Sequence, residues 1–153
     1  MVFSSQADID NFHINFPTCH QIEGDVTISG SDITNLNGLE LVTSFTGNLS
    51  IQLNTVLPSL SGLHNLTSVG GYLSIFTNPA LTSLSGLSSL TSIGGKLQIH
   101  SNNALTNLTG LEGLTSIYGD LQIEFNTALT SLNGLNNVTF IHPLLPFRKP
   151  CTP

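Results

Sequence analysis

Residues 72–95 read YLSIFTNPALTSLSGLSSLTSIGG, and the next 24 residues repeat the same pattern as KLQIHSNNALTNLTGLEGLTSIYG. The pattern also fills residues 48–71 and 120–143, and a copy that is one residue shorter fills residues 25–47. Five copies in register indicate a solenoid, in which each copy forms one coil stacked on its neighbours. We therefore predict five coils of about 24 residues across residues 25–143.

Each copy opens with an alternating L-x-I segment followed by asparagine, which is typical of a short strand that enters a turn. Glycine, serine and threonine weaken helices, so short strands are expected on several sides of each coil. The sequence thus predicts a mainly β, right-handed leucine-rich repeat solenoid. Strict alternation places the residue that follows the strand, Leu53 or Phe125, in the core. One asparagine per coil is expected to stack in a ladder at the turn: Asn54, Asn78, Asn102 and Asn126.

The two ends of the chain depart from the repeat and are expected to cover the first and last coils. Residues 4–16 predict a capping helix, because Ser5 and Asp8 form an N-cap pair and Ile9, Phe12 and Phe16 share one helical face. Residues 144–153, LLPFRKPCTP, contain prolines that forbid another regular coil. Their apolar residues are expected to fold over the last coil. Residues 1–153 are thus interpreted as one repeat domain.

Composition excludes several classes of function. Only 8% of the residues are charged, against roughly 25% in an average soluble protein. The chain holds three Lys and Arg residues and has a net charge of -6, which argues against a nucleic-acid binder. No run reaches the roughly 18 apolar residues of a membrane helix, so membrane insertion is not expected.

The two cysteines lie at opposite ends of the repeat array. Five coils at about 4.8 Å separate Cys19 from Cys151 by roughly 24 Å along the solenoid. A disulfide requires Cα atoms within about 7 Å, so an internal bond between these two residues is not expected. Each cysteine is either a free thiol or one that pairs with a residue outside this chain.

Residues 19–28, CHQIEGDVTI, and the later segments GNLSI, GYLSI, GKLQI and GDLQI carry a family resemblance. The C-x-x-I-x-G-x-[LV]-x-I start and the G-x-L-x-I strand lead resemble the receptor L-domain family, the ligand-binding solenoids of insulin-receptor and epidermal-growth-factor-receptor ectodomains. The QADIDNF segment at residues 6–12 is similar to the opening helix of receptor-L-like repeats in secreted or surface proteins of Bacteroidetes-type bacteria. The resemblance implies a secreted or cell-surface location. It also implies a disulfide from the first cysteine to one just before the helix, where this chain has none.

The outward positions of the L-x-I strands are the candidate binding surface. They form columns in which residues of adjacent coils lie about 4.8 Å apart. Two aromatic residues and most of the charge variation of the array fall there, which is unusual on a surface of Ser, Thr and Asn. The predicted ligand-binding residues are Tyr72, Phe76, Lys96, Gln98, His100, Asp120, Gln122 and Glu124. The alternative is that the aromatic residues fill gaps between coils while the charges keep the face soluble.

No catalytic, metal or cofactor site is predicted. The histidines at positions 13, 20, 64, 100 and 142 lack a metal-like spacing, and His100 beside Glu124 lacks a cleft and a third orienting group. We expect a non-enzymatic recognition or adhesion module that binds a protein or a glycan. One alternative is a structural spacer of a larger surface protein. Another is ice binding through complete threonine columns, of which the fullest is Thr43, Thr67, Thr91, Thr115 and Thr139.

Overall fold

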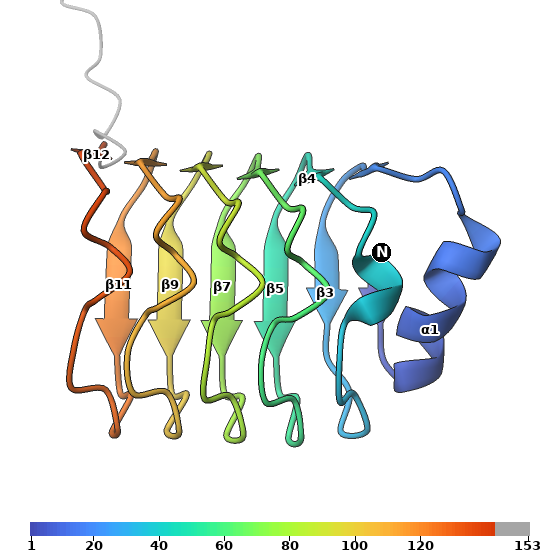
Figure 1. Ribbon diagram of the computed structural model, residues 1–153, viewed down its shortest axis with the longest axis horizontal. Helices are drawn as coiled ribbons and strands as arrows, with labels where there is room; N and C mark the ends of the chain where they lie inside the picture. Colours follow the sequence, from blue (N-terminus) through green and yellow to red (C-terminus); the bar gives the residue numbers. More distant parts are fainter. Residues whose placement is uncertain (143–153) are drawn as a thin grey trace, which may run out of the picture.

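The computed structural model describes residues 1–142, and it confirms the predicted β-solenoid. Two parallel six-stranded sheets run the length of the molecule, and every coil contributes one strand to each sheet (Figure 1). In this view the longer strands stand side by side, and the shorter strands line the upper edge of the coils. The α-helix α1 lies at the end of the solenoid opposite to β11 and β12.

The longer strands form sheet A, in which neighbouring strands are one coil apart in the sequence. Equivalent repeat positions face each other, since Leu73 pairs with Leu97 and Leu97 with Leu121. The register therefore follows the 24-residue repeat without a slip. Sheet A consists of β1 (Val2–Phe3), β3 (Val26–Ile28), β5 (Leu49–Gln52), β7 (Leu73–Phe76), β9 (Leu97–His100) and β11 (Leu121–Glu124).

The shorter strands form sheet B and come from the end of each repeat, where the sequence reads T-S-I-G-G or a variant of it. Each is two residues long, and in all but the last strand the first residue is at least partly exposed and the second is buried. Sheet B consists of β2 (Gln21–Ile22), β4 (Ser44–Phe45), β6 (Ser68–Val69), β8 (Ser92–Ile93), β10 (Ser116–Ile117) and β12 (Phe140–Ile141).

The five expected coils are present, and a further turn precedes them. Val2 and Phe3 pair with Thr27 and Ile28 as strand β1, which the sequence analysis missed because two residues show no periodicity. In this first turn the helix α1 (Gln6–Asn15) replaces the leucine-rich segment and packs against the 3-10 turn η1 (Asn37–Leu39). The helix thus forms part of the first turn and also covers the coil that follows it.

The helix begins where the sequence predicted. Ser5 is the N-cap: its hydroxyl accepts the N–H of Asp8, while the Asp8 carboxylate accepts the N–H of Ser5. Hydrogen bonds from the backbone and hydroxyl of Ser4 hold the pKa of Asp8 below its ordinary value. Ile9 and Phe12 are buried as expected, whereas Phe16 lies at the C-cap and is half exposed, because the helix ends before Phe16 turns inward.

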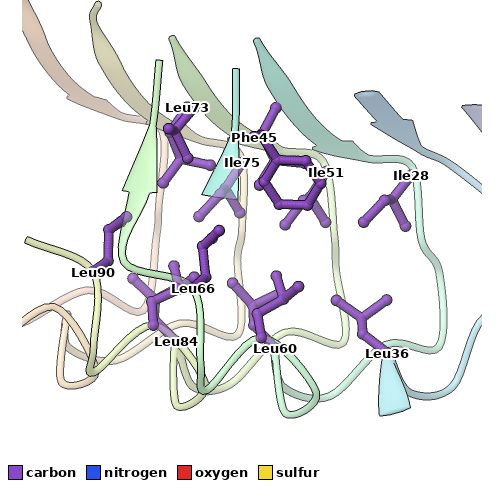
Figure 2. Packing of buried hydrophobic residues seen from close by; sticks show 14 of the residues in the cluster. Ile28, Leu36, Phe45, Ile51, Leu60, Leu66, Leu73, Ile75, Leu84 and Leu90 are labelled. Carbon is purple, nitrogen blue, oxygen red and sulfur yellow. The ribbon is translucent and has the colours of Figure 1, made fainter. Parts of the chain in front are cut away.

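The core consists of apolar columns that run along the solenoid. Ile28, Ile51 and Ile75 lie side by side on the sheet A side, and leucines of the opposite wall face them (Figure 2). These columns are fully buried as far as the fourth repeat. In the last repeat, Leu121 and Ile123 point inward but are only partly buried, because no further described coil covers them. The predicted cap at residues 144–153 lies outside the described residues.

A ladder of asparagines holds one corner of the last four coils, as the sequence predicted. The backbone N–H of Asn78 donates to Oδ1 of Asn102 at 3.1 Å, and that of Asn102 donates to Oδ1 of Asn126 at 2.9 Å. Each amide nitrogen donates back to a strand carbonyl of the preceding coil, as Asn102 Nδ2 does to Ile75 O at 2.9 Å. Asn54, Asn78 and Asn102 are fully buried, and every buried side-chain polar atom of the described chain has a partner.

Glycine is required where one coil passes closely over another. Gly86 has φ of 111°, and a Cβ at this position would collide with the carbonyl oxygen of Leu60 in the preceding coil. Gly62, Gly110 and Gly134 have the same left-handed conformation, so this column of glycines is explained by packing between coils. Within residues 1–142 Cys19 is a free thiol, and its Sγ donates to the carbonyl of Gln21.

We predict that Leu97→Ala lowers the free energy of unfolding by about 2–5 kcal/mol, because it opens a cavity among fully buried side chains. Leu121→Ala removes the same atoms at the same strand position of the last coil, where the side chain is partly exposed. It should therefore lower the free energy of unfolding by less than half as much. Urea denaturation followed by circular dichroism measures both values. Equal losses would contradict the placement of the core.

We also predict that Asn102→Ala destabilises the protein by about 2–6 kcal/mol. The substitution leaves the N–H of Asn78 and the carbonyl of Ile75 without their partner, and each unpaired buried group costs about 1–3 kcal/mol. Asn126→Ala is the matched control, because water reaches this end of the ladder. The same urea titrations should show a clearly smaller loss for the control.

Candidate functional site

The register of sheet A brings the predicted site residues together on its outward face. Phe76, His100 and Glu124 occupy equivalent positions of β7, β9 and β11, so Phe76 faces His100 and His100 faces Glu124. Gln98 pairs with Gln122 in the column beside them. Tyr72, Lys96 and Asp120 precede the same three strands and form a third column. All eight residues therefore lie on three adjacent coils, as the repeat predicted.

Direct contacts hold several of these side chains in place, both between coils and within one coil. The Lys96 ammonium group lies 5.8 Å from the centre of the Tyr72 ring, at the range of a cation–π interaction. The Ser74 hydroxyl donates to Oε1 of Gln98 at 3.3 Å. Nδ1 of His100 is hydrogen-bonded to the hydroxyl of Ser101 at 2.8 Å. Tyr72, Phe76, Lys96 and His100 are half-buried, whereas Asp120 and Glu124 are exposed.

The prediction that Leu53 and Phe125 belong to the core was wrong. The exposed fractions of their side chains are 49% and 70%. Both residues have left-handed backbone conformations, with φ of 57° and 55°, and this conformation ends the alternation of the strand. The chain turns there so that the next residue, the ladder asparagine, faces inward instead.

A signal for this turn was present in the sequence. The equivalent positions of the other two coils hold Thr77 and Ser101, with φ of 55° at each. Polar residues in half of a column argue against a buried column. The first repeat is one residue shorter at this point, and its Gly30 N–H already donates to Oδ1 of Asn54. The residue missing there is therefore the left-handed one.

Phe125 adds an exposed ring to the predicted surface. Its centre lies 5.0 Å from that of the His100 ring, at an interplanar angle of 61°, which is an edge-to-face contact. We call the resulting surface the aromatic face, and it consists of Tyr72, Phe76, Lys96, Gln98, His100, Asp120, Gln122, Glu124 and Phe125.

The first two coils use the same outward column differently. The Asp25 carboxylate accepts the backbone N–H of Asn48, and the Asn48 amide oxygen accepts that of Tyr72, each at 2.9 Å. The bonds from Asn48 hold the pKa of the Asp25 carboxyl below its ordinary value. These two side chains fasten consecutive coils to each other. The column changes to the larger Tyr72 and Lys96 only in the later coils.

The threonine columns also serve to join the coils. The hydroxyl of Thr91 donates to the carbonyl of Thr67 at 3.0 Å, and that of Thr115 donates to the carbonyl of Thr91 at 3.1 Å. The hydroxyl protons are therefore directed at the backbone instead of at solvent. This arrangement supports a structural role for the threonines and does not favour an ice-binding surface.

A second aromatic cluster, which the sequence analysis missed, lies on sheet B at the end of the solenoid away from α1. The Tyr118 and Phe140 rings are 5.4 Å apart, and the Phe140 and His142 rings are stacked at 5.8 Å. Tyr118 takes the place of the glycine that occupies this position in the two preceding repeats. Both sheets therefore carry exposed aromatic side chains on the last coils.

The aromatic face carries several kinds of side-chain group. Among residues 1–142, no group of three or more His, Cys, Asp and Glu side chains is arranged to hold a metal ion. His100 and Glu124 face each other on an open strand face. The aromatic face thus offers apolar rings, amides and carboxylates to a partner molecule.

Comparison with protein families identifies the repeat. The family model described as the receptor L domain matches residues 18–110, which is more than half of the chain. The chain belongs to the receptor L domain family. Comparisons with curated proteins and with solved structures give no match.

Receptor L domains are non-catalytic binding domains that are extracellular in receptors and bind protein ligands there. The match confirms the resemblance found in the sequence. It covers Tyr72, Phe76, Lys96, Gln98 and His100, while Asp120, Gln122, Glu124 and Phe125 lie beyond it. Within residues 1–142 of this receptor L domain, no helix combines the length and hydropathy needed to cross a membrane.

We predict that Phe125→Asn changes the free energy of unfolding by no more than about 1 kcal/mol. Asparagine tolerates the left-handed conformation that costs other residues about 1–2 kcal/mol, which offsets the lost ring contact. Urea denaturation measures the change, and Leu53→Asn serves as a second example. A buried phenylalanine at this site would instead lose about 3–5 kcal/mol on truncation, and such a loss would contradict the outward placement.

Proposed function

We propose that this receptor L domain is a non-enzymatic recognition module that binds a protein or a glycan through its aromatic face, in an extracellular or cell-surface setting. The observation that carries the proposal is the gathering of aromatic, histidine and charged side chains on three adjacent strands whose coils are held rigidly by the asparagine ladder. Preorganised aromatic side chains are typical centres of binding surfaces. The extracellular setting is supported by where the family occurs in receptors.

The alternative is a spacer without a ligand of its own. A spacer needs only small polar side chains at the outward positions, and Ser50 and Ser74 show that the fold accepts them. The rings at Tyr72, Phe76 and Phe125 are not required by the coil, because other repeats lack aromatic residues at the same places. Their presence on adjoining coils supports the recognition module.

The test is a binding screen of the full chain against a glycan array and a panel of extracellular protein domains. The variant Tyr72→Ser/Phe76→Thr/His100→Ser carries small polar residues of the kind found at other outward positions of sheet A, such as Thr27, Ser29 and Ser50, so it should remain folded. We expect at least one ligand whose binding falls about tenfold or more in this variant. The matched control is Thr27→Ser/Ser29→Thr/Gln52→Thr, which alters the same face on the first coils and should bind normally. Absence of any ligand, or equal binding by both variants, would instead favour the spacer.

A further inference from the structure

Strand β11 has hydrogen-bonding groups directed away from the rest of sheet A. Each inward leucine that opens a strand donates its N–H to the next coil: Leu73 N–H to Lys96 O and Leu97 N–H to Asp120 O, both at 2.9 Å. Leu121 is the next residue of this series, so its N–H points to the open edge. The same holds for Phe125, since Ser101 N–H donates to Glu124 O. Among residues 1–142 no strand pairs with this edge.

Among residues 1–142, the inward side chains of β11 have apolar neighbours on one side only. Leu97 and Ile99 are fully buried because coils cover them on both sides. Leu121 and Ile123, at the same positions, are covered on one side only and remain partly exposed. A strand added at the edge would bury them with its own inward side chains, which favours a segment with apolar residues at alternate positions.

The outward side chains of β11 are acidic at both ends of the strand. Asp120 and Glu124 are exposed and lie about 13 Å apart along the strand. Residues 1–142 hold nine Asp and Glu residues but a single Lys or Arg, which is Lys96. Several other acids are engaged with backbone N–H groups, as Asp8 and Asp25 are. The two carboxylates on β11 thus complement a segment with basic residues four positions apart.

We infer that a partner protein docks on this receptor L domain as an extended segment that adds a parallel strand to the edge of β11. Its alternate apolar residues lie inward beside Leu121 and Ile123, and its two basic residues lie outward beside Asp120 and Glu124. This inference rests on the proposed function and deepens it. The added strand enlarges the aromatic face, and its backbone supplies affinity while the basic residues supply selectivity.

Two other occupants of the edge fit these features less well. A second copy of the chain would bring the Asp120 and Glu124 carboxylates of both copies to one seam, where like charges repel. The segment after His142 contains four prolines, and its longest run without one is three residues, 147–149. That run is shorter than the four-residue strands of sheet A, and proline cannot donate to a sheet.

The experiment uses a fluorescein-labelled probe peptide, acetyl-Gly-Lys-Leu-Gln-Ile-Arg-Gly-amide, whose binding to the full chain is followed by fluorescence anisotropy. Two control peptides accompany it, one with Glu in place of both basic residues and one with Pro in place of Gln. We expect the probe to bind at least about tenfold more tightly than either control, because the first control repels the carboxylates and the second lacks a backbone donor. The affinity of the probe should fall in about 0.5 M salt.

Charge reversal gives the sharpest variant. Asp120→Lys/Glu124→Lys alters exposed side chains, so the fold should be unaffected. Its affinity for the basic probe should fall at least about tenfold, and its affinity for the acidic control peptide should rise to a similar extent. The control variant Glu23→Lys/Glu40→Lys makes the same change of net charge at two exposed positions away from β11, and it should keep the preference of the unaltered chain.

Three results would overturn the inference. They are failure of the probe to bind the full chain, equal binding of the probe and the proline peptide, and the same response from both charge-reversal variants. A dimer of the full chain that the probe does not dissociate would also overturn it, because the edge would then belong to a second copy. If the array screen still yields a ligand that requires Tyr72, Phe76 and His100, the proposed function stands and only this inference fails.

Discussion

The asparagine ladder is the constraint on which the rest of the molecule depends. Each buried amide takes the N–H of the coil before it and returns its own protons to that coil and to the next. Such groups are costly to leave unpaired inside a protein, so each of the last four coils places an asparagine at the same depth and in the same orientation. This requirement fixes the length of the repeat and, through it, the register of both sheets.

The ladder also separates the roles of neighbouring residues. The chain must enter a left-handed conformation at Leu53, Thr77, Ser101 and Phe125 so that the following asparagine can face inward. The side chain at that position therefore lies at the surface, where core packing does not restrict the residue type. Large apolar residues at two of these four positions are then a property of the surface, and Phe125 in contact with His100 forms part of the aromatic face.

Most of the architecture was predictable because the same sequence pattern occurs in five copies. The strands, the ladder, the helix cap at Ser5 and the columns of the outward face all follow from spacing and residue type. Strand β1 was missed because two residues show no periodicity, and Val2 and Phe3 are recognised as a strand only by their pairing with β3. The placement of Phe125 was missed because alternation assumes extended backbone up to the turn. The ring cluster of Tyr118, Phe140 and His142 depends on which residues adjoin across coils, and its members are 22 and 2 residues apart in the sequence.

The two ends of the solenoid differ in a way that affects how recognition relates to folding. At one end the helix covers the first coil, whereas at the other Leu121 and Ile123 are only partly buried. In a linear array each coil is stabilised by its neighbours, and among residues 1–142 the last coil has one neighbour, so within this part of the chain it opens most readily. Four of the nine residues of the aromatic face lie on that coil. A ligand that bound this part of the proposed surface would hold the last coil closed, so part of its binding free energy would go into ordering that coil. Its measured affinity would then depend on the local unfolding equilibrium of the final repeat.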